Sequence, residues 1–233
     1  GEEQVEFISQ AIISTIKNSE KQSDFEKMCE SVSEIISRQR FSSVRLSKSL
    51  SQSWPLHPLV TLLLGPISKR SFGQNTRSLF AFLISREPFG FTDFLMNTNI
   101  DSQAIFKPAD LWGYLRENMR NDILHSEDGK KWSIANDKLN KISELEGNHG
   151  NLDSHSAIIK TIAMLEIFTQ GYGMRPTSEL IKTSFPELSS TEIESILANL
   201  QEWNCVIYSE YNNEYKLSSS SDFDFFKSFK LAK

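Results

Sequence analysis

Basic side chains that could bind phosphate are concentrated in one part of this chain. Residues 38–86 contain eight Lys or Arg residues and no Asp or Glu, whereas the whole 233-residue chain has 25 basic and 30 acidic residues. A stretch without acids favours an anionic partner, phosphate or nucleic acid, over a solvated basic face. The candidate contacts are Arg38, Arg40, Arg45, Lys48 and Lys69, and the stretch also holds Arg70, Arg77 and Arg86.

Arg77 has the best local setting in this stretch for a phosphate contact. Asn75 can cap a helix that begins after it, and the free N–H groups of a helix N-terminus attract anions. Arg77 would leave that terminus from the first turn and could reach a phosphate there. The alternative, which local physics alone favours, is that Asn75 is only a cap and Arg77 a solvated residue.

No complete enzyme active site is recognisable in the sequence. No Gly-rich loop precedes a Lys-Ser or Lys-Thr pair at the spacing of a phosphate-binding loop, and no Gly-x-Ser-x-Gly motif marks a serine hydrolase. The histidines and cysteines lack the spacings of a metal site. They are His57, His125, His149, His155, Cys29 and Cys205. We therefore expect this chain alone to have no catalytic activity, no metal and no cofactor.

Two widely separated cysteines indicate a reducing compartment, so the cytoplasm is the expected location. No apolar run approaches the roughly 20 residues of a membrane-spanning helix, and residues 1–4 lack the features of a signal peptide. We therefore expect no membrane partner. Because the chain starts at Gly1 without an initiator Met, the sequence also suggests a fragment of a longer protein.

Apolar residues recur at helical spacing through the first 145 residues, which predicts an all-helical region. The expected helices lie at about 5–16, 25–36, 59–64 and beyond Pro66, 75–85, 94–96, 108–123 and 131–145. Pro58 suits the first turn of its helix, and Thr92 could cap the short helix that follows it. The helix at 75–85 is apolar on nearly every face, so we expect it in the middle of the core. Residues 41–53 are Ser-rich and weakly periodic, which indicates a surface connection.

A polar stretch at residues 146–154 is the best linker candidate. We therefore expect an all-helical domain at residues 1–150 and a second domain at residues 151–233. In the second domain, three helices are expected at about 156–168, 178–185 and 190–200, with a cap at Thr177 or Ser178 and a capping box at Ser189. Strands at 206–208 and 214–217, joined by a turn at 211–213, follow them.

Three helices followed by a β-hairpin is the order of a winged helix-turn-helix unit. The predicted fold class is therefore a mainly α chain, in which a helical, lid-like bundle precedes a C-terminal winged helix with a small β-hairpin. In a DNA reader the third helix would enter the major groove. Here that helix carries Glu192, Glu194 and Glu202 and no Lys or Arg. Because phosphate neutralisation supplies most of the affinity for DNA, a protein contact or a packing role fits the unit better.

Several strings of residues are similar to one known group of proteins. Pro-Leu-His-Pro at 55–58 and Gln-Asn-Thr-Arg-Ser-Leu-Phe-Ala-Phe-Leu at 74–83 come first. Asp-Leu-Trp-Gly-Tyr-Leu at 110–115, Lys-Lys-Trp at 130–132 and Ser-Asp-Phe-Asp at 221–224 follow them in order. Over residues 54–224 the chain resembles the region beyond the nucleotide-binding core of large bacterial P-loop ATPases of the AAA+ and STAND-like type.

The resemblance implies a non-catalytic regulatory and interaction region, a helical lid plus winged helix, that couples nucleotide state to a partner. ATP and Mg²⁺ would then belong to the full-length parent, and the partners would be its nucleotide-binding core, in cis or in a neighbouring subunit, and a further protein. The implied nucleotide-phosphate contacts are Arg77, Asn75 and Arg70, with Arg77 stabilising the charge that develops in phosphoryl transfer. The alternative function is a DNA-binding winged-helix protein that contacts phosphates through residues 38–86.

Overall fold

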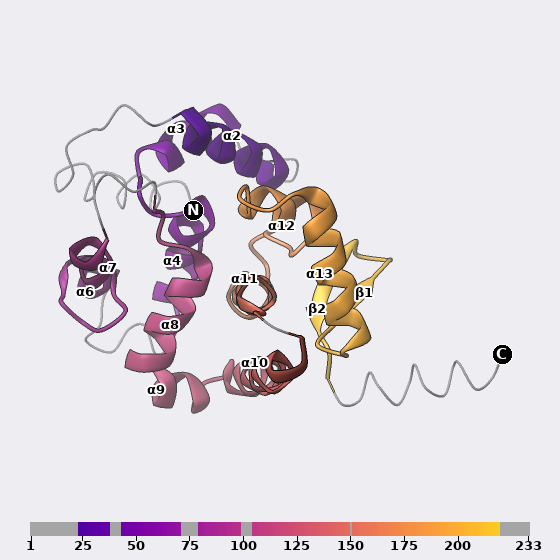
Figure 1. The fold of residues 1–233 in the computed structure, drawn as a ribbon. Coiled ribbons are helices and arrows are strands. Elements are labelled where there is room, and N and C mark those ends of the chain that lie inside the picture. Colours follow the sequence, from indigo (N-terminus) through magenta and orange to yellow (C-terminus); the bar gives the residue numbers. More distant parts are fainter. Residues whose placement is uncertain (1–22, 38–42, 71–78, 99–103, 150, 220–233) are drawn as a thin grey trace.

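Helices make up most of the chain. The computed structural model describes residues 23–37, 43–70, 79–98, 104–149 and 151–219, and these contain eleven helices and one two-stranded antiparallel sheet (Figure 1). The expectation of a mainly α chain with a small C-terminal β-hairpin is confirmed at this level. Among the described residues, no helix has both the length and the apolar character needed to cross a bilayer.

Two helices at the N-terminal end of the described chain, α2 (Ser23–Ser37) and α3 (Ser43–Ser51), pack against each other. The apolar stripe of α2 is buried, as predicted. Helix α3 corrects the expected surface connection at residues 41–53, because Leu46 and Leu50, four residues apart, lie on one buried face. The predicted helix at 5–16 lies outside the described residues.

Helix α4 (Pro58–Ser68) is almost entirely buried and has the expected Pro in its first turn. It continues through Pro66 to Ser68, as predicted. Its N-cap is His57, whose Nδ1 accepts a hydrogen bond from the Leu59 N–H at 3.1 Å. A free N–H group at the helix start is thereby satisfied by a histidine rather than by one of the usual short polar caps.

An aromatic cluster holds α6 (Leu79–Ile84) and α7 (Phe91–Asn97) onto the bundle. The ring centroid of Phe82 lies 5.0 Å from that of Tyr114 and 5.4 Å from that of Phe106, in edge-on contacts. We had expected this helix in the middle of the core. Ile84 is 72% exposed, so α6 lies instead at the margin of the core. Residues 75–78 of the predicted helix lie outside the described residues.

Helix α7 begins differently from the prediction. Its N-cap is Gly90, and the hydroxyl of Thr92, the predicted cap, donates to the Leu83 carbonyl at 3.1 Å. A Cβ atom at Gly90 would come within 2.9 Å of the Glu87 carbonyl oxygen. The turn approaches itself too closely for any other residue, which explains the glycine.

Helices α8 (Pro108–Asn118), α9 (Arg120–Leu124) and α10 (Gly129–His149) follow. Trp112 of α8 and Trp132 of α10 are fully buried and stack with ring centroids 3.8 Å apart. Helix α10 is longer than the predicted 131–145 and includes the first part of the expected linker. Residues 150–152 separate it from α11 (Asp153–Phe168).

Helix α11 lies among the elements that precede and follow it in sequence (Figure 1). It contacts α4, α8 and α10, and also the C-terminal helices and β2. One hydrophobic cluster extends from Leu56 to Leu217 and takes residues from both sides of position 150. The division into domains 1–150 and 151–233 stays a prediction, and α11 is the support that both stretches share.

Three helices and a hairpin end the described chain. After α11 come α12 (Ser178–Ser184), α13 (Ser190–Glu202), β1 (Val206–Ser209) and β2 (Glu214–Leu217). Thr177 caps α12, and Ser189 forms a capping box with Glu192, both as predicted. The strands pair antiparallel with Val206 opposite Leu217. The predicted helices and hairpin are therefore confirmed as elements.

Two different groups cover the outer edge of β2. The Tyr215 N–H donates to the Pro176 carbonyl at 2.9 Å, and the Leu217 N–H donates to Oε2 of Glu166 at 2.8 Å. An uncovered strand edge would leave such backbone groups unpaired. The segment before α12 and one side chain of α11 therefore close this edge.

Candidate functional site

The described basic residues of segment 38–86 occupy different helices. Arg45 and Lys48 are exposed on α3, whereas Lys69 is exposed at the end of α4. The Lys69 ammonium lies 5.5 Å from the centre of the Tyr172 ring, which is a cation–π contact. The predicted contacts that lie outside the described residues are Arg38, Arg40, Asn75 and Arg77.

Acidic residues of α2 supply part of the counter-charge that segment 38–86 lacks. Lys48 lines a groove of about 450 Å³ together with Glu26, Glu30 and Glu34 of α2. All four side chains are exposed. The absence of acids along this stretch of sequence is therefore balanced in space by a neighbouring helix.

Arg70 is held inside the fold by three contacts. Its Nη1 donates to Glu127 at 2.7 Å, and its Nη2 donates to the Ile167 carbonyl at 2.9 Å. Its Nε lies 3.2 Å from Oδ2 of Asp128, an ion pair rather than an aligned hydrogen bond. Burial raises the pKa of the Asp128 carboxyl, and the Arg70 guanidinium opposes that shift. Arg70 thus fastens the end of α4 to the start of α10 and the end of α11.

His57 joins the helical region to the C-terminal helices. Its Nδ1 accepts the Leu59 N–H, so the proton of the neutral ring is on Nε2, which donates to the Ser184 carbonyl at 3.2 Å. The side chain is 2% exposed, and burial lowers its pKa from 6.5 to about 4. Both ring nitrogens are engaged, so this histidine is a fixed structural contact rather than a metal ligand or a proton carrier.

The exposed surface of α13 and the hairpin carries acids and tyrosines. Tyr211 is 97% exposed between the strands, and Tyr208 is partly exposed on β1. Residues 178–217 include seven Glu and only two Lys. We call this surface the α13–hairpin face, and its exposed acids are Glu192, Glu194, Glu202 and Glu210. Its charge is unsuited to a phosphate backbone.

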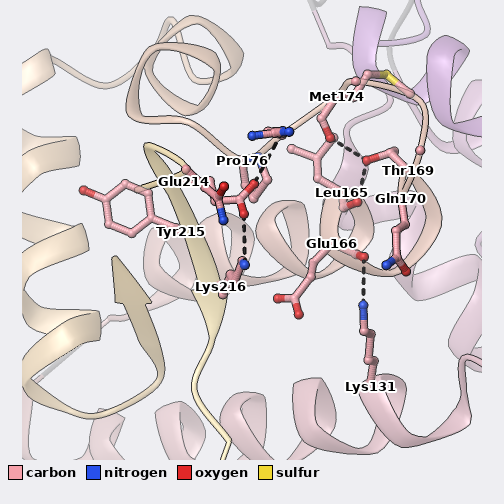
Figure 2. Close-up of a pocket in the computed structure, with 14 residues that line it drawn as sticks. Lys131, Leu165, Glu166, Thr169, Gln170, Met174, Pro176, Glu214, Tyr215 and Lys216 are labelled. Carbon is pink, nitrogen blue, oxygen red and sulfur yellow. Dashed lines mark hydrogen bonds and ion pairs between the residues drawn. The ribbon is translucent and has the colours of Figure 1, made fainter. Parts of the chain in front are cut away.

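A polar pocket of about 490 Å³ lies between α11, the segment before α12 and the hairpin (Figure 2). We call it the α11–hairpin pocket. Figure 2 shows that charged side chains from several elements border it. They are Lys131 of α10, Glu166 of α11, Arg175 of the segment before α12, and Glu214 and Lys216 of β2.

The segment between α11 and α12 forms one wall of this pocket. The Thr169 hydroxyl lies 2.6 Å from the Leu165 carbonyl oxygen and 2.5 Å from that of Met174, so it ties the segment to the end of α11. Gly171 and Gly173 have φ angles of 85° and 78°, which glycine adopts without strain. Local residues therefore fix the shape of this wall.

The charged groups of the α11–hairpin pocket are only partly paired with one another (Figure 2). Glu214 lies 3.0 Å from Nζ of Lys216 and 3.9 Å from Nε of Arg175. Oε2 of Glu166 accepts a backbone N–H of β2, and burial raises the pKa of this carboxyl. Lys131 donates to the backbone carbonyl of Glu166 at 3.4 Å. Three cations thus face two carboxylates.

In the described part of the chain, no group of three or more His, Cys, Asp or Glu is placed to hold a metal ion. Comparisons of the chain with protein-family models, curated proteins and solved structures found no match.

The sequence alone predicts neither the α11–hairpin pocket nor the roles of Glu166 and His57. Glu166 had a usable signal, because it is an acid within the apolar run of α11, where a charge is costly to bury. His57 had none, since its partner, Ser184, lies 127 residues away in sequence. Contacts between residues so far apart in sequence become visible only in the folded chain.

Proposed function

We propose that this chain is a non-catalytic interaction region whose last three helices and hairpin, α11 to β2, form a winged helix-turn-helix unit that binds a protein partner. The order of the elements supports the winged helix. So does the backbone hydrogen bond from Tyr215 to Pro176 at the outer edge of β2. This bond brings the segment just before α12, the second helix of the unit, against the hairpin.

The negative charge of the α13–hairpin face is the main reason to propose a protein, and not a nucleic acid, as the partner. Glu194 is paired with Lys182, and Glu192 closes the capping box of α13. Glu202 and Glu210 are therefore the acids that would repel DNA phosphates and attract a partner with a basic surface. Tyr208 and Tyr211 add exposed aromatic area, which is common at protein interfaces. The partner is therefore a protein that presents Lys and Arg side chains to this face.

We further propose that the parent protein is a multidomain P-loop ATPase of the AAA+ and STAND-like type. The ordered strings of residues within 54–224 support this parent. Its core, in cis or in a neighbouring subunit, would bind ATP and Mg²⁺, and this region would couple the nucleotide state to the protein partner in the cytoplasm. Arg77 and Asn75 remain the candidates that would face the nucleotide.

Fluorescence anisotropy with a labelled DNA duplex of random sequence tests whether the chain binds nucleic acid instead of a protein. We expect no binding even at about 25 mM salt, where phosphate contacts are strongest. Micromolar binding that weakens steeply as salt rises would overturn the proposal. It would favour a DNA-binding protein that uses the basic residues of segment 38–86.

A labelled peptide of alternating Arg and Ala tests the α13–hairpin face itself. Binding should weaken when Glu202 and Glu210 are changed to Gln, because the attraction falls with the charge. The matched control changes Glu117 and Glu144, exposed acids of α8 and α10, to Gln and should bind as the unaltered chain does. Equal weakening in both double variants would reflect net charge alone and would contradict the proposed face.

A further inference from the structure

We propose that the α11–hairpin pocket binds a compact anion, a phosphate or carboxylate group, with Lys131 and Arg175 as its charged contacts. The pocket has a volume of about 490 Å³, within the range of small-molecule sites. It lies where α10, α11 and the hairpin meet, so a ligand there would contact both the helical region and the C-terminal elements. The proposal is independent of the α13–hairpin face and of its protein partner.

Arg175 has donors to spare. It shares the Glu214 carboxylate with Lys216, whose ammonium is the closer of the two, at 3.0 Å against 3.9 Å. The Arg175 side chain is half exposed. A guanidinium has five N–H donors, and the contact with Glu214 involves only its Nε. The remaining donors can take an anion, and their planar arrangement suits phosphate or carboxylate oxygens.

Lys131 has no carboxylate within ion-pair distance among the described residues. Its side-chain hydrogen bond there goes to the Glu166 backbone carbonyl at 3.4 Å, beyond the usual range of about 2.7–3.2 Å. Figure 2 shows this side chain reaching from α10 to the end of α11, at the border of the pocket. An anionic oxygen would be a stronger acceptor for its ammonium than this carbonyl.

Lys131 also lies where a cation is unfavourable for its own helix. Lys130 and Lys131 are in the first turn of α10, which contains no acid. The helix macrodipole disfavours positive charge at that end. Asp128, just before the helix, is already paired with Arg70. The carbonyl end of α11 attracts Lys131, but only through a long contact, whereas an anion in the pocket would offset the cost directly.

The two carboxylates of the pocket leave an excess of one positive charge. Glu214 is occupied by Lys216, and Glu166 directs Oε2 to the Leu217 N–H. Burial disfavours the charged form of Glu166, which further lowers the repulsion of an anion. A small anion with one or two charges therefore fits this site. A long polyanion would be repelled by the acids that line it, Glu166 and Glu214.

Isothermal titration calorimetry with inorganic phosphate and with succinate, at constant ionic strength, tests the proposal and distinguishes the two anion types. Lys131→Gln and Arg175→Gln should each weaken binding about 10-fold or more, because each removes a charge-assisted hydrogen bond. Lys130→Gln is the matched control. It removes the same charge from an exposed neighbour on α10 and should change the affinity by less than about 2-fold.

Two further variants separate lost binding from lost folding. Lys131→Arg keeps the charge and should retain binding. Glu214→Gln removes the carboxylate that competes for Arg175 and should tighten binding, a gain that misfolding cannot produce. The proposal is overturned if the unaltered chain binds neither anion at about 10 mM. The proposal would also be overturned if Lys130→Gln weakened anion binding as much as Lys131→Gln does, or if Glu214→Gln did not tighten it.

Discussion

The Nε2 atom of His57 lies 3.2 Å from the carbonyl oxygen of Ser184, although 127 residues separate the two in sequence. The contact joins the start of α4 to the end of α12. Burial lowers the pKa of the ring in the folded chain to about 4, against 6.5 for an ordinary histidine, so the ring is neutral near pH 7. The protonation of one side chain is thereby linked to the packing of two distant segments.

Acidification from pH 7 to pH 5 should lower the free energy of unfolding by about 2 kcal/mol through His57. Below pH 6.5 His57 binds a proton in the unfolded chain, whereas in the folded chain it stays neutral until the pH nears 4. The contribution of His57 to the free energy of unfolding is therefore fully present above pH 6.5 and is lost as the pH falls. Urea unfolding at several pH values measures the loss. His57→Asn keeps a side-chain acceptor for the Leu59 N–H and should flatten the profile. An unchanged slope in that variant would contradict the assignment.

Arg70→Gln should destabilise the chain by about 3 kcal/mol, because it leaves the buried Asp128 carboxyl without its cation. Adding Asp128→Asn should restore part of the loss, and chemical denaturation measures both changes. Arg86→Gln, at an exposed arginine of the same basic segment, is the control and should stay within about 0.5 kcal/mol. A silent Arg70→Gln would instead leave this arginine available for the nucleotide contact that the resemblance implies.

Phe82→Ala should cost about 3 to 5 kcal/mol, because the ring is buried against Phe106 and Tyr114. Phe89→Ala removes a ring that is 54% exposed and should cost much less. Urea unfolding of the two variants compares the losses directly. Similar values would mean that the aromatic cluster does not anchor α6.

Glu166→Ala should release one backbone amide of the hairpin. The Leu217 N–H loses its acceptor, so its hydrogen exchange should accelerate about 10-fold or more. The Ser218 N–H, which donates to the Cys205 carbonyl at 3.0 Å, should keep its protection. Exchange followed residue by residue with NMR measures both amides. If both accelerate equally, the hairpin opens as a unit and Glu166 is not a local clasp.

Elements with a strong local signal could be predicted from the sequence. The start of α13 is marked by the capping box at Ser189, and the apolar residues of α2 and α13 recur at helical spacing. Helix α3 was missed because its serines conceal the one apolar pair, Leu46 and Leu50, that is buried. Thr92 was wrong as a cap because its hydroxyl bonds to a neighbouring helix, which no local pattern encodes.

The candidate sites were harder to predict, because counting charges along the chain ignores the partners that folding supplies. The eight basic residues of segment 38–86 suggested unpaired cations. In space, Lys48 lies beside the acids of α2, and Arg70 is paired with Glu127 and Asp128. The α11–hairpin pocket combines side chains from four elements or segments, so no single stretch of sequence could reveal it.

The stacked indoles of Trp112 and Trp132 give the α8–α10 contact an optical signature. Two chromophores with centroids 3.8 Å apart and planes 18° from parallel couple their electronic transitions. Neither ring is exposed, so each has the other rather than water as its environment. The coupled near-ultraviolet circular dichroism of this pair should vanish when α8 and α10 separate, and it reports on that event without any added label.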